Sequence, residues 1–278
     1  LDFLVGDPRT KYHPTAWMGK LIASLVPFTK SNSAKKELLG GILIVSIIVA
    51  TVCTVLVVLD IGISLLTIDI ISLVVSIAVG SILLKTTIAI RGMQKHALAV
   101  VDAVEKEDLD SARNHLSMIV KRDTKHLDKN HILSAVLESV SENTVDGVTG
   151  PLFYYAIFGL PGAFVYRAIN TIDSMVGYKT ALFKNVGWFG AKCDTVLNYL
   201  PSRLTALVMI LGALILGYNW KESLYIMKRD SRKLESPNAG FPMAALAGAL
   251  GTRLEKMNYY TIGNGSIEFT KSHIISAV

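Results

Sequence analysis

The residues of this chain that could carry out chemistry are concentrated between Glu138 and Lys179. This block is set in an apolar protein, because 51% of the 278 residues are hydrophobic. Polar and ionisable groups among apolar segments are costly, so they indicate a functional site by default. The chemically capable side chains of the block are Glu138, Glu142, Asn143, Asp146, Arg167, Asn170, Asp173 and Lys179. We therefore expect the block to form the active site of a membrane enzyme.

The side-chain types in this block suit a magnesium or phosphate site. Glu142, Asn143 and Asp146 come at the end of a predicted helix, where Gly147 turns the chain into a loop. Carboxylates and carboxamides suit Mg²⁺, which takes oxygen ligands and usually keeps waters and substrate phosphates. Arginine and lysine suit phosphates, arginine through its bidentate fork. The alternative interpretation is a buried network of ion pairs and hydrogen bonds that holds membrane helices together.

Other classes of chemistry lack their signatures in this sequence. There is no G-x-x-x-x-G-K-[ST] string, so the chain is not a P-loop enzyme, and no Ser-His-Asp elbow is apparent. The six histidines have no H-x-x-x-H spacing suited to zinc, and Cys53 and Cys193 form neither a C-x-x-C motif nor a disulfide framework. No basic-aromatic stripe or nucleic-acid module occurs, so we expect no nucleic-acid partner.

Two apolar runs ahead of the block predict a transmembrane hairpin. Residues 38–59 contain no charge, and residues 61–84 are interrupted only by Asp69. A helix of this length matches a hydrocarbon core of roughly 30 Å. Basic residues flank the pair, whereas the link offers only Asp60 and Asp69 as charges, so the positive-inside rule places the link outside and both flanks in the cytoplasm. We assign the formal net charge of +6 mainly to this topology, and secondarily to phosphate binding.

The segment 85–150 is predicted to be polar and helical. We expect Asp108 to cap the N-terminus of one helix and Asn130 to cap the next. At 100° per residue, Glu138 and Glu142 fall on the side of the second helix opposite its apolar residues. A solvated helix face is the simpler interpretation of this pair. A catalytic interpretation requires that the polar face look into a cleft.

The remaining apolar segments are less regular. Residues 151–168 are broken by Gly159 and Pro161, which favours a re-entrant or buried helical pair over a simple span. Residues 200–218 are predicted to form a further transmembrane segment, and the side of the membrane reached by later segments stays open. The sequence thus predicts an all-α, polytopic integral protein of the cell membrane. It is expected to form one domain over residues 1–278, with helical polar segments facing the cytoplasm.

A turn-rich polar segment, residues 6–19, precedes the first apolar run. Its Asp7, Arg9 and His13 could line a site, although a single histidine beside a proline is more often an ordinary loop residue. Together with other strings in the chain, this segment resembles the CobD/CbiB family of cobalamin biosynthesis. The strings are G-D-P-R-x-x-x-H-P at 6–14, R-D-T-x-x-L-D at 122–128, E-x-V-x-E-N-T-V-D-G-V at 138–148, P-L-F at 151–153, P-G-A-x-x-Y-R-A-x-N-T-x-D-S-M-x-G-Y at 161–178 and S-P-N-A-G at 236–240.

The resemblance implies a membrane-bound adenosylcobinamide-phosphate synthase. Such a ligase forms an amide on the propionate side chain of cobyric acid, with aminopropanol phosphate or aminopropanol as the amine donor. ATP is consumed as a substrate, and it binds together with Mg²⁺. A carboxylate is a poor electrophile, so it is first activated as an acyl phosphate, and the charge that develops when the amine attacks needs cationic stabilisation.

The resemblance also leads to hypotheses for the roles of individual residues. The residues expected to be catalytic are Glu142, Asp146, Asp123 and Asp194, with Asp123 or Asp194 accepting the amine proton. Those expected to bind substrate or nucleotide are Arg122, Asn143, Arg167, Asn170, Lys179, Arg229, Ser236 and Asn238. Those expected to hold Mg²⁺ are Glu142, Asp146 and Asp173.

Two other functions are weighed against the ligase. A membrane prenyltransferase is suggested by the Asn170–Asp173 string, but it would carry two D-x-x-x-D clusters, which this sequence does not have. A transporter or assembly subunit would use the polar block as a pathway, and it would have more complete spans and a repeat symmetry. The expected partners beside the substrates are the lipid bilayer and either a second copy of the chain or other enzymes of the cobalamin pathway.

Overall fold

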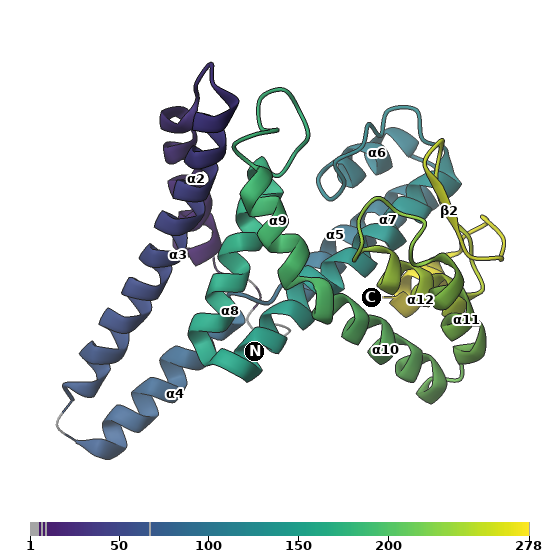
Figure 1. Ribbon diagram of the computed structural model, residues 1–278. Helices are drawn as coiled ribbons and strands as arrows, with labels where there is room; N and C mark the ends of the chain where they lie inside the picture. Colours follow the sequence, from purple (N-terminus) through teal and green to yellow (C-terminus); the bar gives the residue numbers. More distant parts are fainter. Residues whose placement is uncertain (1–5, 7, 9, 67, 278) are drawn as a thin grey trace. The chain divides into compact units, whose positions relative to one another are not determined.

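The computed structural model describes residues 6, 8, 10–66 and 68–277, and the chain divides into two compact units (Figure 1). The first unit comprises residues 1–89 and 146–197, and the second comprises residues 90–145 and 198–278. Helices make up most of the described residues, which confirms the predicted helical fold.

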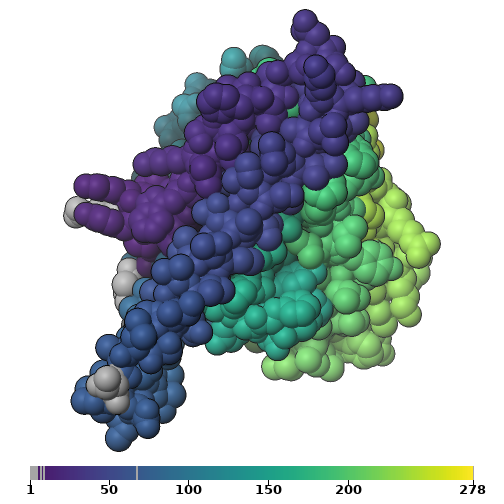
Figure 2. Space-filling model, turned by 60° about the vertical axis from the view of Figure 1, so that its left-hand side comes forward, coloured from purple at the N-terminus to yellow at the C-terminus, as the bar shows by residue number. Residues whose placement is uncertain are grey.

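The first unit consists of long apolar helices. Its elements are η1 (Thr10–Tyr12), α2 (Pro14–Thr29), α3 (Ala34–Ser64), α4 (Asp69–Lys85), α8 (Gly150–Val176) and α9 (Trp188–Leu197). The side chains of α2 pack along α3 (Figure 2). The core of this unit is formed by Met18, Ile22, Ile44, Val45, Ile48, Val52, Leu56, Phe164, Ala168, Ile172, Val176 and Val186. Other apolar side chains of α3, including Leu43, Val55 and Val58, are exposed, as expected for a face that meets lipid.

Helix α8 is broken near its middle. Gly159 has φ of 64° and ψ of −154°, a backbone conformation outside the helical region that only glycine adopts readily. Pro161 follows two residues later and lacks the N–H group that a continuous helix would use. The glycine and proline that predicted a broken segment are therefore the residues that divide the helix.

The second unit combines helices with one small β-hairpin. Its elements are α5 (Ile90–Glu105), α6 (Leu109–Ser117), α7 (Lys129–Thr144), α10 (Tyr199–Ile215), α11 (Trp220–Asp230), α12 (Gly240–Leu250), β1 (Leu254–Lys256), β2 (Tyr260–Ile262) and α13 (Lys271–Ala277). The strands are antiparallel, with Leu254 opposite Ile262, and they were not predicted from the sequence. The core is built around fully buried residues of α5, α6, α7, α12 and the hairpin, among them Val100, Leu116, Ile132, Leu137, Ala244 and Leu254.

The two predicted helix caps have different outcomes. Asp108 accepts a hydrogen bond from the Ser111 N–H at 2.9 Å and caps α6, as predicted. The prediction that Asn130 caps α7 is wrong. Asp128 is the cap, because its carboxylate accepts from the His131 N–H at 3.0 Å and the helix has already begun at Lys129.

Several helical stretches are long and apolar enough to cross a bilayer. Within the described residues these are Ala34–Ser64, Asp69–Glu105 and Lys129–Val176, and the count rises to four if α9 and α10 form one broken span. These lengths are consistent with a multi-pass membrane protein. The bounds predicted for the hairpin, 38–59 and 61–84, and for the later span, 200–218, stay predictions.

Candidate functional site

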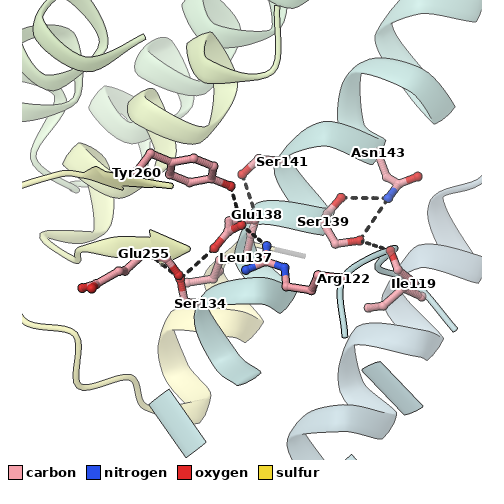
Figure 3. A network of polar contacts seen from close by, with 10 residues as sticks. All are labelled: Ile119, Arg122, Ser134, Leu137, Glu138, Ser139, Ser141, Asn143, Glu255 and Tyr260. Carbon is pink, nitrogen blue, oxygen red and sulfur yellow. Dashed lines mark hydrogen bonds and ion pairs between the residues drawn. The ribbon is translucent and has the colours of Figure 1, made fainter. Parts of the chain in front are cut away.

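A buried carboxylate lies at the centre of a polar network in the second unit (Figure 3). Glu138, on α7, is 2% exposed. Its Oε2 accepts from the Tyr260 hydroxyl at 2.6 Å and from Nη2 of Arg122, and its Oε1 accepts from Ser134 Oγ at 2.9 Å. The interpretation of this position as part of a solvated helix face is therefore wrong. Three donors satisfy the carboxylate, as a buried charge requires.

The same network connects four segments of the second unit. Ser134 accepts from the Glu255 N–H at 2.8 Å, which joins α7 to β1, while Tyr260 comes from β2 and Arg122 from the loop ahead of α7. Burial raises the pKa of Tyr260, and the negative charges of Glu138 and Glu142 raise it further. The phenol thus stays protonated and remains a hydrogen-bond donor to Glu138 at physiological pH.

Two predicted catalytic or binding residues follow Glu138 on α7. Glu142 lies one turn further along the helix and is exposed, and its charge acts on Tyr260. Asn143 donates from Nδ2 to the Ser139 carbonyl oxygen at 2.8 Å and to Ser139 Oγ at 3.2 Å. The structure thus brings Arg122 into the network and places Glu142 close enough for its charge to act on Tyr260, whereas Asn143 bonds to its own helix.

Asp123 lies on the surface of the second unit. It is exposed, and its carboxylate accepts from the Lys125 N–H at 3.0 Å, a local turn contact. The neighbouring Arg122 points into the network, so the two residues of one motif have different surroundings. A role for Asp123 as a proton acceptor stays a prediction.

The S-P-N-A-G string forms the entry to α12 and is held by a residue that the sequence did not single out. Ser236 Oγ accepts from the Asn238 N–H at 3.4 Å, and Asn238 Oδ1 accepts from Arg203 Nη1 at 3.1 Å. The Arg203 guanidinium lies 3.6 Å from the ring centre of Tyr199 and 4.2 Å from that of Phe241. Both rings attract the cation through cation–π interactions.

Arg229 is engaged with a buried carboxylate. Its guanidinium donates to both oxygens of Asp230 at 2.6 Å, and Asp230 is 0% exposed. Asp230 also pairs with Lys233 at 2.7 Å and accepts from the Gly263 N–H at 2.9 Å. Burial alone would raise the pKa of Asp230, but the hydrogen bonds from Arg229, Lys233 and Gly263 outweigh it and lower the pKa to about 2.

In the first unit, three of the predicted residues form a chain of hydrogen bonds. Arg167 Nη1 donates to the Asp146 carbonyl oxygen at 3.2 Å and lies 3.5 Å from Asn170 Oδ1. Asn170 Nδ2 donates to Asp194 Oδ1 at 3.2 Å, which links α8 to α9. A cation, a carboxamide and a carboxylate therefore meet within one unit.

Asp146 belongs to η2 (Val145–Thr149), a turn of π-helix. Such turns are rare, and they occur often at functional sites because they displace a side chain from regular helical positions. The sequence predicted that the helix ends here and turns into a loop. Helix α7 does end at Thr144, but the predicted loop is wrong, because the π-helical turn leads directly into α8 at Gly150.

Asp173 and Lys179 lie at the C-terminal end of α8. The Asp173 carbonyl oxygen accepts from the Gly177 N–H at 2.8 Å, and Lys179 is exposed beyond the helix. Among the described residues, no group of three or more His, Cys, Asp or Glu side chains could hold a metal ion. Mg²⁺ is usually bound by one or two carboxylates together with substrate phosphates, so a role for these carboxylates with a magnesium nucleotide stays a prediction.

The N-terminal segment is described only in part. Asp7 and Arg9 lie outside the described residues. His13 caps α2, because its Nδ1 accepts from the Thr15 N–H at 3.2 Å, so it has a local structural role. Lys85, which ends α4, is buried and donates to the Gly6 carbonyl oxygen.

Tyr260, Arg203 and Lys85 were missed by reasoning from the sequence. Each acts on a partner far away in the chain, 122 residues away for Tyr260, 35 for Arg203 and 79 for Lys85. Helical spacing cannot reveal such contacts. Correlated variation between two positions among relatives is the signal that could reveal such contacts.

Known proteins resemble the whole chain. A family model described as CobD/Cbib protein matches residues 1–275. The chain is 40% identical to a probable cobalamin biosynthesis protein CobD of Methanothermobacter thermautotrophicus, over 100% of this chain and 89% of the relative. It is 38% identical to a protein of the same description from Methanocaldococcus jannaschii, over 98% and 88%. It is 41% identical to the cobalamin biosynthesis protein CobD of Leptospira interrogans, over 94% and 81%. No solved structure matches the chain.

Proposed function

Because the chain belongs to the CobD/CbiB family of cobalamin biosynthesis proteins, we propose that it is an amide-forming synthase that joins aminopropanol phosphate to cobyric acid. ATP provides the driving force. The proposal places the reaction at the membrane, with the active site on the cytoplasmic side. The basic residues that flank the first two apolar runs support that side, because basic segments stay in the cytoplasm.

One observation carries this proposal. Arg167, Asn170 and Asp194 come from two helices and meet through hydrogen bonds beside the Asp146 carbonyl oxygen. An arginine fork suits a phosphate, and a carboxylate close to it suits proton transfer or magnesium. The resemblance alone would not have required these positions to converge in one unit.

The proposed reaction has two steps. An oxygen of the cobyric acid carboxylate attacks the γ-phosphorus of ATP, which forms an acyl phosphate and releases ADP. The amine then attacks the acyl carbon, phosphate leaves with the electrons of the cleaved C–O bond, and the amide remains. Arg167 would bind phosphate oxygens, Asn170 would orient the Asp194 carboxylate, and Asp194 or Asp123 would take the amine proton.

Magnesium would enter with the nucleotide in this proposal. Its chemistry would be to screen the phosphate charges during phosphoryl transfer. Asp146 and Asp173 of the first unit are the carboxylates proposed to hold it. Both side chains are partly exposed, which is compatible with ligands that also face solvent and phosphate.

The test is a complete reaction with the purified protein in detergent. Cobyric acid, aminopropanol phosphate and Mg-ATP are supplied together, and corrin mass and ADP are measured in the same samples. We expect cobinamide phosphate and ADP in equal amounts, and neither when one substrate is omitted. Replacing aminopropanol phosphate with aminopropanol identifies the amine donor. Folded protein that yields no amide with either donor would refute the synthase and favour a transporter or assembly subunit.

A further inference from the structure

The Glu138 network presents one cation in a fixed orientation. Arg122 is 16% exposed, and Glu138 is its one hydrogen-bonding partner among the described residues. The ion pair engages Nη2, so other N–H groups of the fork stay available for a ligand. Nothing in the reaction proposed above uses Glu138 or Tyr260.

Glu138 is better placed to orient Arg122 than to react. It is 2% exposed and accepts from Tyr260 and Ser134 as well as from Arg122. A carboxylate bonded in this way (Figure 3) is fixed in position, because Ser134 on α7 is fully buried and Tyr260 on β2 packs against the core. Fixing a flexible side chain before a ligand arrives removes an entropy cost from binding.

We propose that Glu138 and Tyr260 are positioning residues that hold Arg122 as a preformed binding site for the phosphate group of a substrate. The inference rests on the proposed function for the identity of that substrate. Two sources have the same chemistry, the amino-alcohol phosphate and the nucleotide. Both offer a phosphate ester that an arginine fork binds through two N–H groups.

Glu142 adds a second feature to this site. It is exposed on the same face of α7, one turn after Glu138, and close enough for its charge to act on Tyr260. A carboxylate near an anion-binding arginine repels a ligand that carries only negative charge, and it attracts a ligand that also carries a positively charged group. Aminopropanol phosphate carries an ammonium group and a phosphate in one molecule, which fits this pair of charges, and the kinetic test distinguishes it from the magnesium nucleotide.

The test compares three substitutions by steady-state kinetics. Glu138→Gln removes the charge that orients Arg122, Tyr260→Phe removes one hydrogen bond to Glu138, and Arg122→Lys removes the fork. We expect the KM for aminopropanol phosphate to rise about tenfold for Glu138→Gln and Arg122→Lys, and about threefold for Tyr260→Phe. The KM for ATP should stay within about twofold of the wild-type value, because ATP is not expected to bind to Arg122. A rise in the KM for ATP alone would instead identify the nucleotide as the ligand.

Coupling between the substitutions separates positioning from a merely structural role. If Glu138 acts through Arg122, the Glu138→Gln/Arg122→Lys double variant should have a KM for aminopropanol phosphate no higher than that of the worse single variant. If the network only stabilises the fold, melting temperatures fall while both KM values stay unchanged, and the inference is overturned. Asp110→Asn is the control, because it removes an exposed ion pair with Arg113 elsewhere in the same unit.

A binding measurement keeps this inference separate from the synthase proposal. Titration calorimetry without cobyric acid measures the Kd for aminopropanol phosphate and for ATP on the wild type and on the folded variants. Weaker binding of one of them to Arg122→Lys would support the site even if no amide is ever formed. Unchanged Kd values for both compounds in Arg122→Lys and Tyr260→Phe would refute it. Tyr260→Phe covers the case in which Glu138→Gln does not fold.

Discussion

Asp230 is a buried carboxylate whose hydrogen bonds make stability depend on pH. Its folded pKa of about 2 lies below the ordinary value of 3.8, so its contribution to stability is present above pH 4 and is lost as pH falls towards 2. The contribution is roughly 2 kcal/mol. We expect Asp230→Asn to lower the melting temperature at pH 7, and the gap to the wild type to close near pH 2. A difference in melting temperature between the two proteins that does not change with pH would show that the charge of Asp230 does not contribute to stability.

Glu142 and Asp146 are predicted to act in turnover and not in folding. Glu142 is exposed and Asp146 is partly exposed, so their isosteric variants should leave packing intact. Glu142→Gln and Asp146→Asn should each lower kcat by about 100-fold or more, while the protein is recovered from membranes at the wild-type level. Near-normal activity in both variants, measured with the amide assay, would contradict their assignment.

Sequence strings named the positions of this site but not their surroundings. Reasoning from the sequence named Arg167, Asn170 and Asp194, whose side-chain types suit phosphate chemistry, and the structure joins the three by hydrogen bonds. The burial of Glu138 could not be predicted, since an i, i+4 pair of glutamates on a helix is usually solvated and its partner Tyr260 lies 122 residues away. The burial of a polar group depends on distant segments, and local spacing carries no information about them.

Helix α3 illustrates how a glycine permits close packing. A Cβ on Gly41 would lie 2.1 Å from the Val186 carbonyl oxygen, whereas a Cβ on Gly62 of the same helix would meet nothing within 4 Å. Gly41→Ala should therefore destabilise the protein by about 1–3 kcal/mol. Gly62→Ala should be neutral or slightly stabilising, because alanine favours helix. The melting temperatures of the two variants in detergent are compared. Equal values would show that the loop at Val186 shifts to make room for the added methyl group.

The types of element were predictable where a pattern is long. Long apolar runs predicted α3 and α4, since a helix satisfies its own backbone in an apolar medium. Gly159 and Pro161 predicted the break in α8 from backbone chemistry alone. The hairpin of β1 and β2 was missed because its strands have three residues each, too few for an alternating pattern to stand out.

The arrangement of charge along the chain predicts which side of the membrane each end of α3 reaches. Lys30, Lys35 and Lys36 precede or open this helix, while the link to α4 is bordered by Asp60 and Asp69. Translocating lysine is disfavoured and aspartate has little effect, so the lysines are expected to stay in the cytoplasm. The cytoplasmic side proposed for the active site rests on this orientation.

Single cysteines test the orientation. Cys53 and Cys193 are first replaced by alanine, and then Asn32→Cys before α3 or Ser64→Cys at its end is introduced, both at exposed positions. A membrane-impermeant maleimide should label Ser64→Cys on intact cells, and Asn32→Cys only after the membrane is opened. The reverse pattern would place the lysines outside and move the proposed site away from cytoplasmic ATP. Labelling of both from one side would mean that α3 does not cross the membrane, because a helix that spans the bilayer must separate its ends.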